Sequence, residues 1–387
     1  MRYNCPISSL QNETELSGDF FDEFLLESSD LSRVGSLCVE EMCGVARGLN
    51  QLGKRVVLVW DLLMTQSVFE KKQLIFEAID LTLFDAVRVS DPGAYHYLNT
   101  KFPNTAVQLV LDNGNHNLAG ILGWEKLSGN LERLVLSSQL PFNIITQYCI
   151  NLSTDVEIQI FGKIPLFYSP RKLLNSHLEQ ASGSALLEAV GTSEESPHKG
   201  FTILENEHGT FMYHPKELSL MDRIEKLNVS KIKWGRFDLR HPHQVSSVGV
   251  LEELVSNFSA SAYREFRESY SHQLIRGFFE VNKTDAQFKN LVNRKVQRKD
   301  ENYLGEIAEV KKERYLGIDI KKCEGTLRLG QKVLIKTPDG KELLTSFKKC
   351  FDVDGVEIQT ITKPGLYRFN FIPKTSKKSQ IYLYSGE

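Results

Sequence analysis

Short apolar runs alternate with longer amphipathic stretches between about residues 31 and 169. Apolar runs of this length are typical of buried strands, and apolar positions at helical spacing are typical of helices packed on a sheet. Such strand-then-helix units imply parallel strands joined by right-handed crossovers, in either an open doubly wound sheet or a closed barrel. We expect strands at 54–61, 84–91, 106–112, 131–137 and 156–162, and helices at 38–52, 67–79, 117–127 and 142–152.

The pattern changes after residue 170. Residues 176–200 are rich in Ser, Glu and Gly and predict a loop or insertion. Short strands are expected at 201–204 and 231–234, with a helix at 218–227 between them and a long helix at 245–270. From residue 303 onward, short apolar runs separated by turns, one of them Asp339-Gly340, predict a small antiparallel β-barrel. The predicted organisation is an α/β domain at 1–280, a basic linker at 281–302 and a β-barrel domain at 303–387.

Charge is distributed unevenly along the chain. The whole sequence has 47 Lys and Arg against 49 Asp and Glu, a net charge of −2. Residues 281–387 hold 22 Lys and Arg and 14 Asp and Glu, a net charge of +8, which leaves −10 for residues 1–280. A basic domain can concentrate a polyanion such as RNA by counterion release. Lysine pairs also protect strand edges from aggregation, so both interpretations stay open.

Composition narrows the class of protein. With 41% apolar and 25% charged residues, the chain is typical of a globular protein, which excludes disordered, collagenous and fibrous classes. No stretch approaches the roughly 18 apolar residues of a membrane span, and we expect no secretory signal and no membrane partner. The six cysteines are scattered, as reduced thiols are in a cytosolic protein. We therefore expect a cytoplasmic location.

Polar residues follow several predicted strands, among them Asp61, Asp91 and Ser137. Barrel enzymes place their sites at the carboxyl ends of strands, but Asp and Ser are also good helix N-caps. No G-x-G-x-x-G motif follows the first strands, which argues against a Rossmann cofactor domain.

Four segments carry a family resemblance. Residues 161–172, FGKIPLFYSPRK, resemble the collagenase-like peptidase family (U-32), in which a strand ending in His-Gly leads to Tyr-Ser-x-Arg-Cys. Three further segments agree with this family in type and order: the Glu-x-Gly-Thr turn and Leu-Asp helix at 205–222, the strand KIKWGR at 231–236, and RGFF at 276–279. The resemblance covers about residues 31–385. It implies a TIM-barrel-like core with a small C-terminal antiparallel β-barrel.

The resemblance also implies a function class. Members are labelled peptidases, yet several belong to oxygen-independent systems that hydroxylate tRNA, ribosomal RNA or a ubiquinone precursor, with prephenate as the oxygen source. Those members hold an iron–sulfur cluster on four cysteines. Here the first two cysteine positions are Pro165 and Lys172, and residues 173–200 contain no cysteine. We therefore predict no cofactor. Trp234 replaces the acidic residue of the Ile-Glu-Gly-Arg strand. The loss of this acid and the loss of the cluster cysteines are expected at one face, and together they indicate altered or absent catalysis.

Two arginines are candidates for binding a small anion. Arg171 and Arg236 each follow a glycine-containing strand end, and planar guanidinium groups suit a dicarboxylate such as prephenate, or a phosphate. In a barrel, both would face one pocket at the carboxyl-end mouth. Alternatively, they pair with Glu157, Glu205 or Glu207 inside the barrel. Tyr168, which lies near Arg171, and His116, which follows a predicted strand, are further substrate-binding candidates, and a loop histidine with its own hydrogen-bond partners is the alternative for His116.

Catalytic candidates are fewer. Glu205, Glu207 and His208 form a dense titratable set that suits acid–base chemistry or a metal, and a surface turn is the alternative. His241 and His243 form a His-x-His pair that is another possible metal pair, with the same alternative of a surface turn, and we assign no metal site. There is no G-x-S-x-G elbow, so Ser169 is the single serine candidate for nucleophilic hydrolysis.

Three function hypotheses follow. The chain acts in an RNA- or quinone-hydroxylation system, either as a divergent enzyme or as a cluster-free subunit paired with a homologous family member. Alternatively, it is a collagenase-like peptidase. As a third possibility, it is a non-catalytic module whose basic β-domain binds RNA or an acidic protein.

Overall fold

The computed structural model describes residues 1–11, 16, 18–111, 115–127, 129–174, 186–192, 199–280, 302–321, 327–338 and 341–384. The chain divides into two units, Met1–Val281 and Asn282–Glu387. The predicted linker at 281–302 lies outside the described residues except for Asn302.

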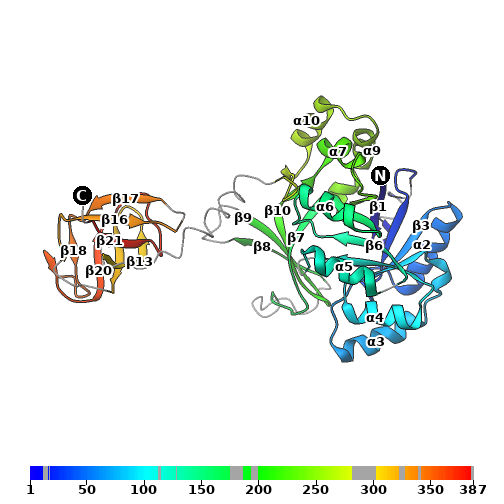
Figure 1. The fold of residues 1–387 in the computed structure, drawn as a ribbon, viewed down its shortest axis with the longest axis horizontal. Helices are drawn as coiled ribbons and strands as arrows, with labels where there is room; N and C mark the ends of the chain where they lie inside the picture. The colour runs from blue at the N-terminus through cyan, green and yellow to red at the C-terminus, as the bar shows by residue number, and fades with distance from the viewer. Residues whose placement is uncertain are drawn as a thin grey trace. The chain divides into compact units, whose positions relative to one another are not determined.

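The first unit is a closed barrel of eight parallel strands with helices around it (Figure 1). The strands pair in the order β11-β1-β2-β3-β4-β5-β6-β7, and β11 also pairs with β7, which closes the ring. The predicted TIM-barrel-like core is therefore confirmed. Its strands are β1 (Arg2–Ile7), β2 (Glu23–Glu27), β3 (Arg55–Trp60), β4 (Ala86–Val89), β5 (Ala106–Leu111), β6 (Leu131–Leu136), β7 (Asp155–Ser169) and β11 (Trp234–Phe237).

Helices connect the consecutive barrel strands from β2 to β7 and cover the outside of the barrel (Figure 1). Met42, Val45 and Leu49 of the first of them pack into the main hydrophobic core together with strand residues such as Leu58. The helices expected between residues 38 and 152 are confirmed. They are α2 (Val39–Gln51), α3 (Gln66–Glu77), α4 (Pro92–Lys101), α5 (Leu118–Leu127) and α6 (Phe142–Asn151), with a 3₁₀ turn η1 (Leu81–Leu83).

The prediction of one long helix at 245–270 is wrong. The segment forms α8 (Pro242–Val245), α9 (Val248–Ser256) and α10 (Ala260–Ser269). The chain is extended at Ser259, whose Oγ accepts the N–H of Ala262 and caps α10. A capping serine of this kind starts a new helix rather than continuing the old one.

Strand β7 is much longer than expected and leaves the barrel at Gly162. This glycine has φ of +110°, and an added Cβ would lie 2.3 Å from the carbonyl oxygen of Asp238, so no other residue fits without strain. Beyond Gly162 the strand pairs antiparallel with β10 (Gly209–Ser219), which continues the sheet to β9 (Lys199–Asn206) and β8 (Leu187–Thr192). The segment expected as a helix from 218 instead ends β10 and forms η2 (Met221–Arg223) and α7 (Ile224–Asn228), and β12 (Leu274–Ile275) pairs with β10.

The second unit is antiparallel, as predicted. Seven strands pair in the order β17-β16-β21-β13-β14-β20-β18 around an apolar core that includes Ile318, Ile335 and Phe369. The predicted Asp339-Gly340 turn lies outside the described residues. The strands are β13 (Tyr303–Lys311), β14 (Tyr315–Ile320), β16 (Lys332–Lys336), β17 (Glu342–Ser346), β18 (Cys350–Phe351), β20 (Gly365–Asn370) and β21 (Gln380–Leu383), with a separate pair, β15 (Leu327–Arg328) and β19 (Thr360–Ile361). Among the described residues, no helix has the length and apolar character needed to cross a membrane.

Candidate active-site pocket at the barrel mouth

The barrel interior contains a layer of buried, mutually paired charges. Asn4, Glu23, Arg88, Arg133 and Glu157 come from five strands, and each is at most 2% exposed. Glu157 Oε2 accepts hydrogen bonds from Arg88 Nη2 at 2.6 Å and from Arg133 Nη1 at 3.0 Å. Arg133 Nη2 donates to Glu23 Oε2 at 2.9 Å, and Asn4 Nδ2 donates to both carboxylates. Because these two acids and two bases neutralise one another, the layer supports the barrel and leaves little charge for a ligand.

The arginines decide the ionisation state of Glu157. Burial by itself disfavours the charged carboxylate, but the nearby guanidiniums of Arg88, Arg133 and Arg236 outweigh that effect. Together they lower the pKa of Glu157 to about 2. This carboxyl is therefore ionised at neutral pH and is not a general acid.

A cavity of about 500 Å³ opens at the carboxyl ends of the barrel strands. Most of its wall is apolar and includes Trp124 and Phe167, while Ser90 contributes a buried hydroxyl that has no hydrogen-bond partner within the described part of the chain. Two arginines, Arg33 and Arg236, are among the described lining residues, and no carboxylate is. The described wall of the cavity thus combines apolar surface with two arginine side chains, both of which also line the smaller cavity described below.

Strand β11 places Arg236 in this pocket. In register, Arg236 lies opposite Asn4 of β1 and Gln159 of β7, and its Nη2 donates to Gln159 Oε1 at 3.3 Å. Its buried Nε has no hydrogen-bond partner, and the guanidinium makes no ion pair, as far as the described residues reach. A guanidinium presents five N–H donors and no acceptor. A carboxylate or phosphate that accepts from two of its N–H groups would satisfy it.

The second arginine is held at the rim of the pocket. The backbone N–H of Arg33 donates to Asp61 Oδ1 at 2.8 Å, and its Nε lies 3.9 Å from Asp61 Oδ2. The guanidinium carbon lies 4.5 Å from the ring centre of Tyr168, whose hydroxyl donates to the carbonyl of His208. Burial raises the pKa of Tyr168, so this ring remains neutral and supports the Arg33 cation.

Acidic side chains line a smaller neighbouring cavity of about 100 Å³. Both oxygens of Glu27 accept from Arg240, at 2.6 and 2.9 Å, and Arg240 Nη1 donates to Asp238 Oδ2 at 2.8 Å. Burial raises the pKa of Glu27, and the contacts with Arg240 oppose this rise. Arg240 therefore neutralises Glu27 and Asp238 beside the smaller cavity.

Two of the four predicted binding residues, Arg236 and Tyr168, line the larger cavity. Arg171 is exposed and lines neither mouth cavity, because β7 continues past the barrel to Ser169 and Arg171 follows that antiparallel arm. The structure therefore does not bring Arg171 and Arg236 together in one described pocket. His116 accepts from Tyr148 through its carbonyl, its Nε2 is buried without a partner in the described residues, and it does not line the cavity.

The expected pairing of the two arginines with internal acids is not observed either. Within the described residues, neither Arg171 nor Arg236 makes an ion pair with Glu157, Glu205 or Glu207; Arg236 acts on Glu157 only through its charge. A binding role for Arg171 stays a prediction.

The predicted acid–base residues lie in the hairpin of β9 and β10. Glu205 is 2% exposed and accepts from Thr210 Oγ1 and from the N–H of Leu174, both at 2.6 Å. The Glu207 side chain is 68% exposed, and its carboxylate lies 3.5 Å from His208 Nε2. Glu205 thus faces different partners from the other two, and none of the three lines a mouth cavity.

Ser169 is part of a turn at the end of β7. Its Oγ accepts the backbone N–H of Arg171 at 3.2 Å, and among the described residues no histidine or carboxylate contacts that hydroxyl. The contacts of Ser169 are those of a turn serine.

Pro165 and Trp234, the two changes expected to affect one face, lie in different places. Pro165 lines the cavity, whereas Trp234 begins β11, is 2% exposed and packs with its ring 3.6 Å from the guanidinium carbon of Arg133. The expectation that both changes affect one face is therefore wrong, because Trp234 packs against the paired layer and does not line the pocket.

Burial raises the pKa of Cys149 to about 11, so this thiol is a poor metal ligand at neutral pH.

Sequence reasoning missed Arg33, Arg88 and Arg133. A signal was present for two of them. Arg88 interrupts an apolar strand, Arg133 follows Glu132 in a strand that is otherwise apolar, and a charge in a buried strand requires a partner. For Arg33, nothing in the local sequence indicates a place at the barrel mouth.

The comparisons with known proteins agree with one another. A family model described as peptidase family U32 matches residues 32–298. Two curated proteins, both named tRNA hydroxylation protein P, are similar to the chain: that of Haemophilus influenzae is 23% identical over 194 residues, and that of Escherichia coli is 24% identical over 191. Each alignment covers 37% of this chain and 42% of the relative, so the chain spans less than half the length of these relatives.

Solved structures show weaker similarity. A U32 peptidase is 12% identical, with 42% of this chain and 70% of that chain covered and a TM-score of 0.34. A tryptophan synthase from M. tuberculosis is also 12% identical, with 41% and 73% covered and a TM-score of 0.32. The fold described above therefore rests on the strand pairings themselves.

Proposed function

The chain belongs to peptidase family U32, and on that premise we propose that it acts in the hydroxylation of RNA, with the barrel-mouth cavity binding a small carboxylate-bearing co-substrate. The similar curated proteins are named for tRNA hydroxylation, which favours this branch of the family over a peptidase. The observation that carries the proposal is the larger cavity, whose described lining contains Arg33 and Arg236 and no carboxylate.

The character of the pocket favours one kind of ligand. Its volume of about 500 Å³ is within the usual range for a small-molecule site. The wall combines apolar surface at Trp124 and Phe167 with the Arg236 guanidinium and with the Ser90 hydroxyl, which has no hydrogen-bond partner among the described residues. An apolar ring bearing carboxylates, as in prephenate, matches both properties because the ring contacts the wall and a carboxylate accepts from Arg236.

In the proposed function, the chain binds no iron–sulfur cluster of its own. Pro165 lies in the cavity wall where the family resemblance places the first cluster cysteine, and Lys172 stands at the second position. A redox-active centre would then be supplied by a homologous family subunit. The net charge of +8 in residues 281–387 would attract the RNA, and both partners would be met in the cytoplasm.

Calorimetric titration tests the ligand site. Prephenate and inorganic phosphate are titrated into wild-type protein and into Arg236→Met and Arg171→Met. Arg171→Met removes the same charge from an exposed position outside the cavity, so it also tests the predicted binding role of Arg171. We expect Arg236→Met to raise the dissociation constant of prephenate at least about tenfold, as loss of a charge-assisted contact would, and Arg171→Met to leave it unchanged. Equal affinity in all three proteins would remove the site from the proposal.

Nucleoside mass spectrometry tests the pathway. In a strain lacking the gene, hydroxylated nucleosides in tRNA or ribosomal RNA should fall, and the Arg171→Met chain should restore them while Arg236→Met does not. Unchanged RNA with an accumulated quinone precursor would assign the chain to quinone hydroxylation. Cleavage of denatured collagen that disappears in Ser169→Ala or Glu205→Gln would support the peptidase alternative.

A further inference from the structure

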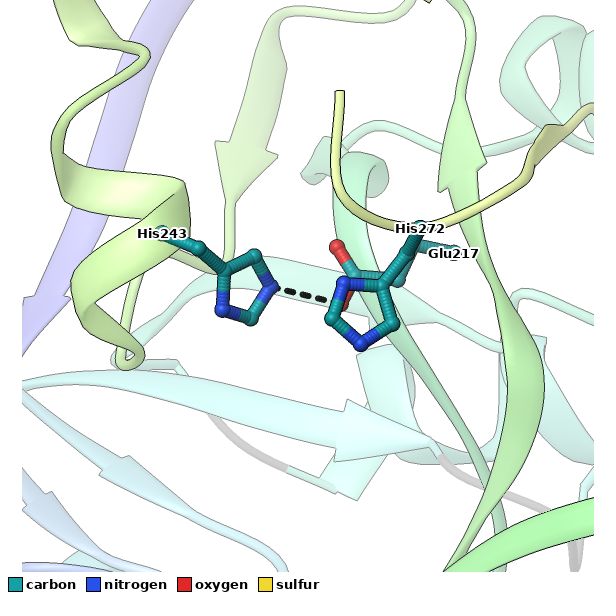
Figure 2. Close-up of side chains that lie close together, drawn as sticks. All are labelled: Glu217, His243 and His272. Atoms are coloured by element: carbon teal, nitrogen blue, oxygen red, sulfur yellow. Dashed lines mark hydrogen bonds and ion pairs between the residues drawn. The ribbon is translucent and has the colours of Figure 1, made fainter. Parts of the chain in front are cut away.

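We propose that Glu217, His243 and His272 bind a divalent transition-metal ion such as Zn²⁺, at a site separate from the barrel-mouth pocket. Their ligand atoms all lie within 4.8 Å of one another, and no other group of this kind occurs among the described residues. Glu217 is near the end of β10, His243 is in α8, and His272 precedes β12. Figure 2 shows the two imidazoles and the carboxylate gathered at one point.

Glu217 is rigidly positioned for this role. It is 1% exposed, and its Oε2 accepts from Gln244 Nε2 at 3.0 Å and from the Tyr270 hydroxyl at 2.7 Å. These contacts leave Oε1 facing His243 Nε2, at 3.0 Å. Hydrogen-bonded neighbours of this kind orient the ligands of metal sites.

The backbone brings His272 to the same place. The N–H of Glu217 donates to the carbonyl of Gln273, and Glu217 is the register partner of Leu274, so β12 is fixed against β10 directly after His272. The ring centres of His243 and His272 lie 4.5 Å apart.

The donor types select a class of metal. Two imidazoles and one carboxylate make up the protein ligands of many zinc and non-haem iron sites, whereas Mg²⁺ and Ca²⁺ prefer oxygen ligands. An ion about 2.0–2.2 Å from each donor requires donors roughly 3–3.5 Å apart. His243 and Glu217 already meet this distance, and His272, which is exposed, can approach by rotation of its side chain. Water would complete the coordination on the exposed side.

Two neighbouring groups influence the affinity. His241 lies beside His243, with ring centres 5.8 Å apart, but it is not a member of the group, so the His-x-His pair contributes one ligand. Lys163 acts on Glu217 through its charge and would compete with the ion.

Zinc and cobalt titration of the untagged full chain tests the proposal after chelator treatment. Wild-type protein should bind one Zn²⁺ per chain by calorimetry and elemental analysis, and Co²⁺ should give the visible absorption of a site with nitrogen ligands. His272→Ala is the main variant because this side chain is exposed and its loss should not affect folding. We expect it to weaken Zn²⁺ binding by at least the 10–100-fold that loss of a supporting contact costs.

His96→Ala is the matched control, since His96 is an exposed histidine on α4 outside the group. It should bind Zn²⁺ as the wild type does, and Mg²⁺ should bind to none of these proteins. If wild-type protein takes up no Zn²⁺, or if His272→Ala and His96→Ala bind it equally well, the three residues form only a hydrogen-bonded ion pair with a neighbouring histidine and the proposal is overturned.

Discussion

Replacing Glu157 by Gln should destabilise the barrel strongly, because this carboxylate holds the buried charged layer together. Glu157 accepts two hydrogen bonds from Arg88, one from Arg133 and one from Asn4. The amide of Gln has the same shape but no charge, and its NH₂ group would face guanidinium donors. Arg88 would then be left with Glu23 as its nearest carboxylate, and Arg133 with Glu23 and Glu132.

Two lines of reasoning give a similar magnitude. Removing one partner of a buried ion pair typically costs about 3–5 kcal/mol. Independently, the pKa of Glu157 falls from its ordinary value of 4.5 to about 2 on folding, which corresponds to about 3 kcal/mol of stability at neutral pH. We therefore expect the free energy of unfolding of the barrel unit to fall by about 3 kcal/mol or more.

Tryptophan fluorescence during urea unfolding measures this unit selectively. The sequence has three tryptophans, Trp60, Trp124 and Trp234, and all lie in the first unit. Glu252→Gln is the control, since Glu252 is exposed on α9 and its loss of charge should change the free energy of unfolding by less than about 0.5 kcal/mol.

The pH dependence provides a second test with a definite sign. A carboxyl whose folded pKa is lowered contributes its full stability above the unfolded pKa, here 4.5, and loses it as the pH falls towards about 2. The difference between wild type and Glu157→Gln should therefore shrink progressively below pH 4.5. A loss of less than 1 kcal/mol at pH 7, or a difference that does not change with pH, would refute the reasoning.

Three further predictions concern other parts of the chain. Gly162→Ala should destabilise the barrel by at least about 2 kcal/mol in the same urea assay, because φ is +110° and the Cβ would meet the Asp238 carbonyl, whereas Gly44→Ala, in open space on α2, should be neutral or stabilising. Arg240→Met should cost about 3–5 kcal/mol by stranding Glu27, and adding Glu27→Leu should recover much of that loss in thermal unfolding. RNA binding, if present, should weaken steeply with salt in a filter assay, and neutralising four basic residues should reduce the salt slope; undetectable or salt-insensitive binding would contradict this. The four residues are Arg294, Lys295, Arg298 and Lys299.

Periodicity predicted the strands and helices from β3 to α6 because each barrel unit contains a continuous apolar strand and an amphipathic helix. It missed β1 and β2. β1 contains the inward-facing Asn4 together with Pro6, and β2 begins and ends with Glu23 and Glu27, so neither strand reads as an apolar run. These polar residues are the ones that face the interior of the barrel and belong to its charged groups.

The candidate site was predicted in part, since Arg236 and Tyr168 line the cavity and Arg171 does not. The difference arises at Gly162, where β7 leaves the ring and continues as an antiparallel arm, a change that a local pattern does not reveal. The Glu217 group was invisible for a related reason: its three members are far apart in sequence, and only the pairing of β10 with β12 and the position of α8 bring them together.

The positive character of the larger cavity depends on residues that do not line it. Arg88 and Arg133 neutralise Glu23 and Glu157 in the layer of buried charges, so no carboxylate there pairs with Arg236. Arg240 does the same for Glu27 and Asp238 beside the smaller cavity. Without either group of ion pairs, acidic side chains would be left uncompensated next to Arg236 and would compete with an incoming anion for its N–H groups. In the proposed function, the affinity for a carboxylate ligand would therefore depend on how completely the rest of the barrel has paired its own acids, because that pairing leaves the N–H groups of Arg236 to the ligand.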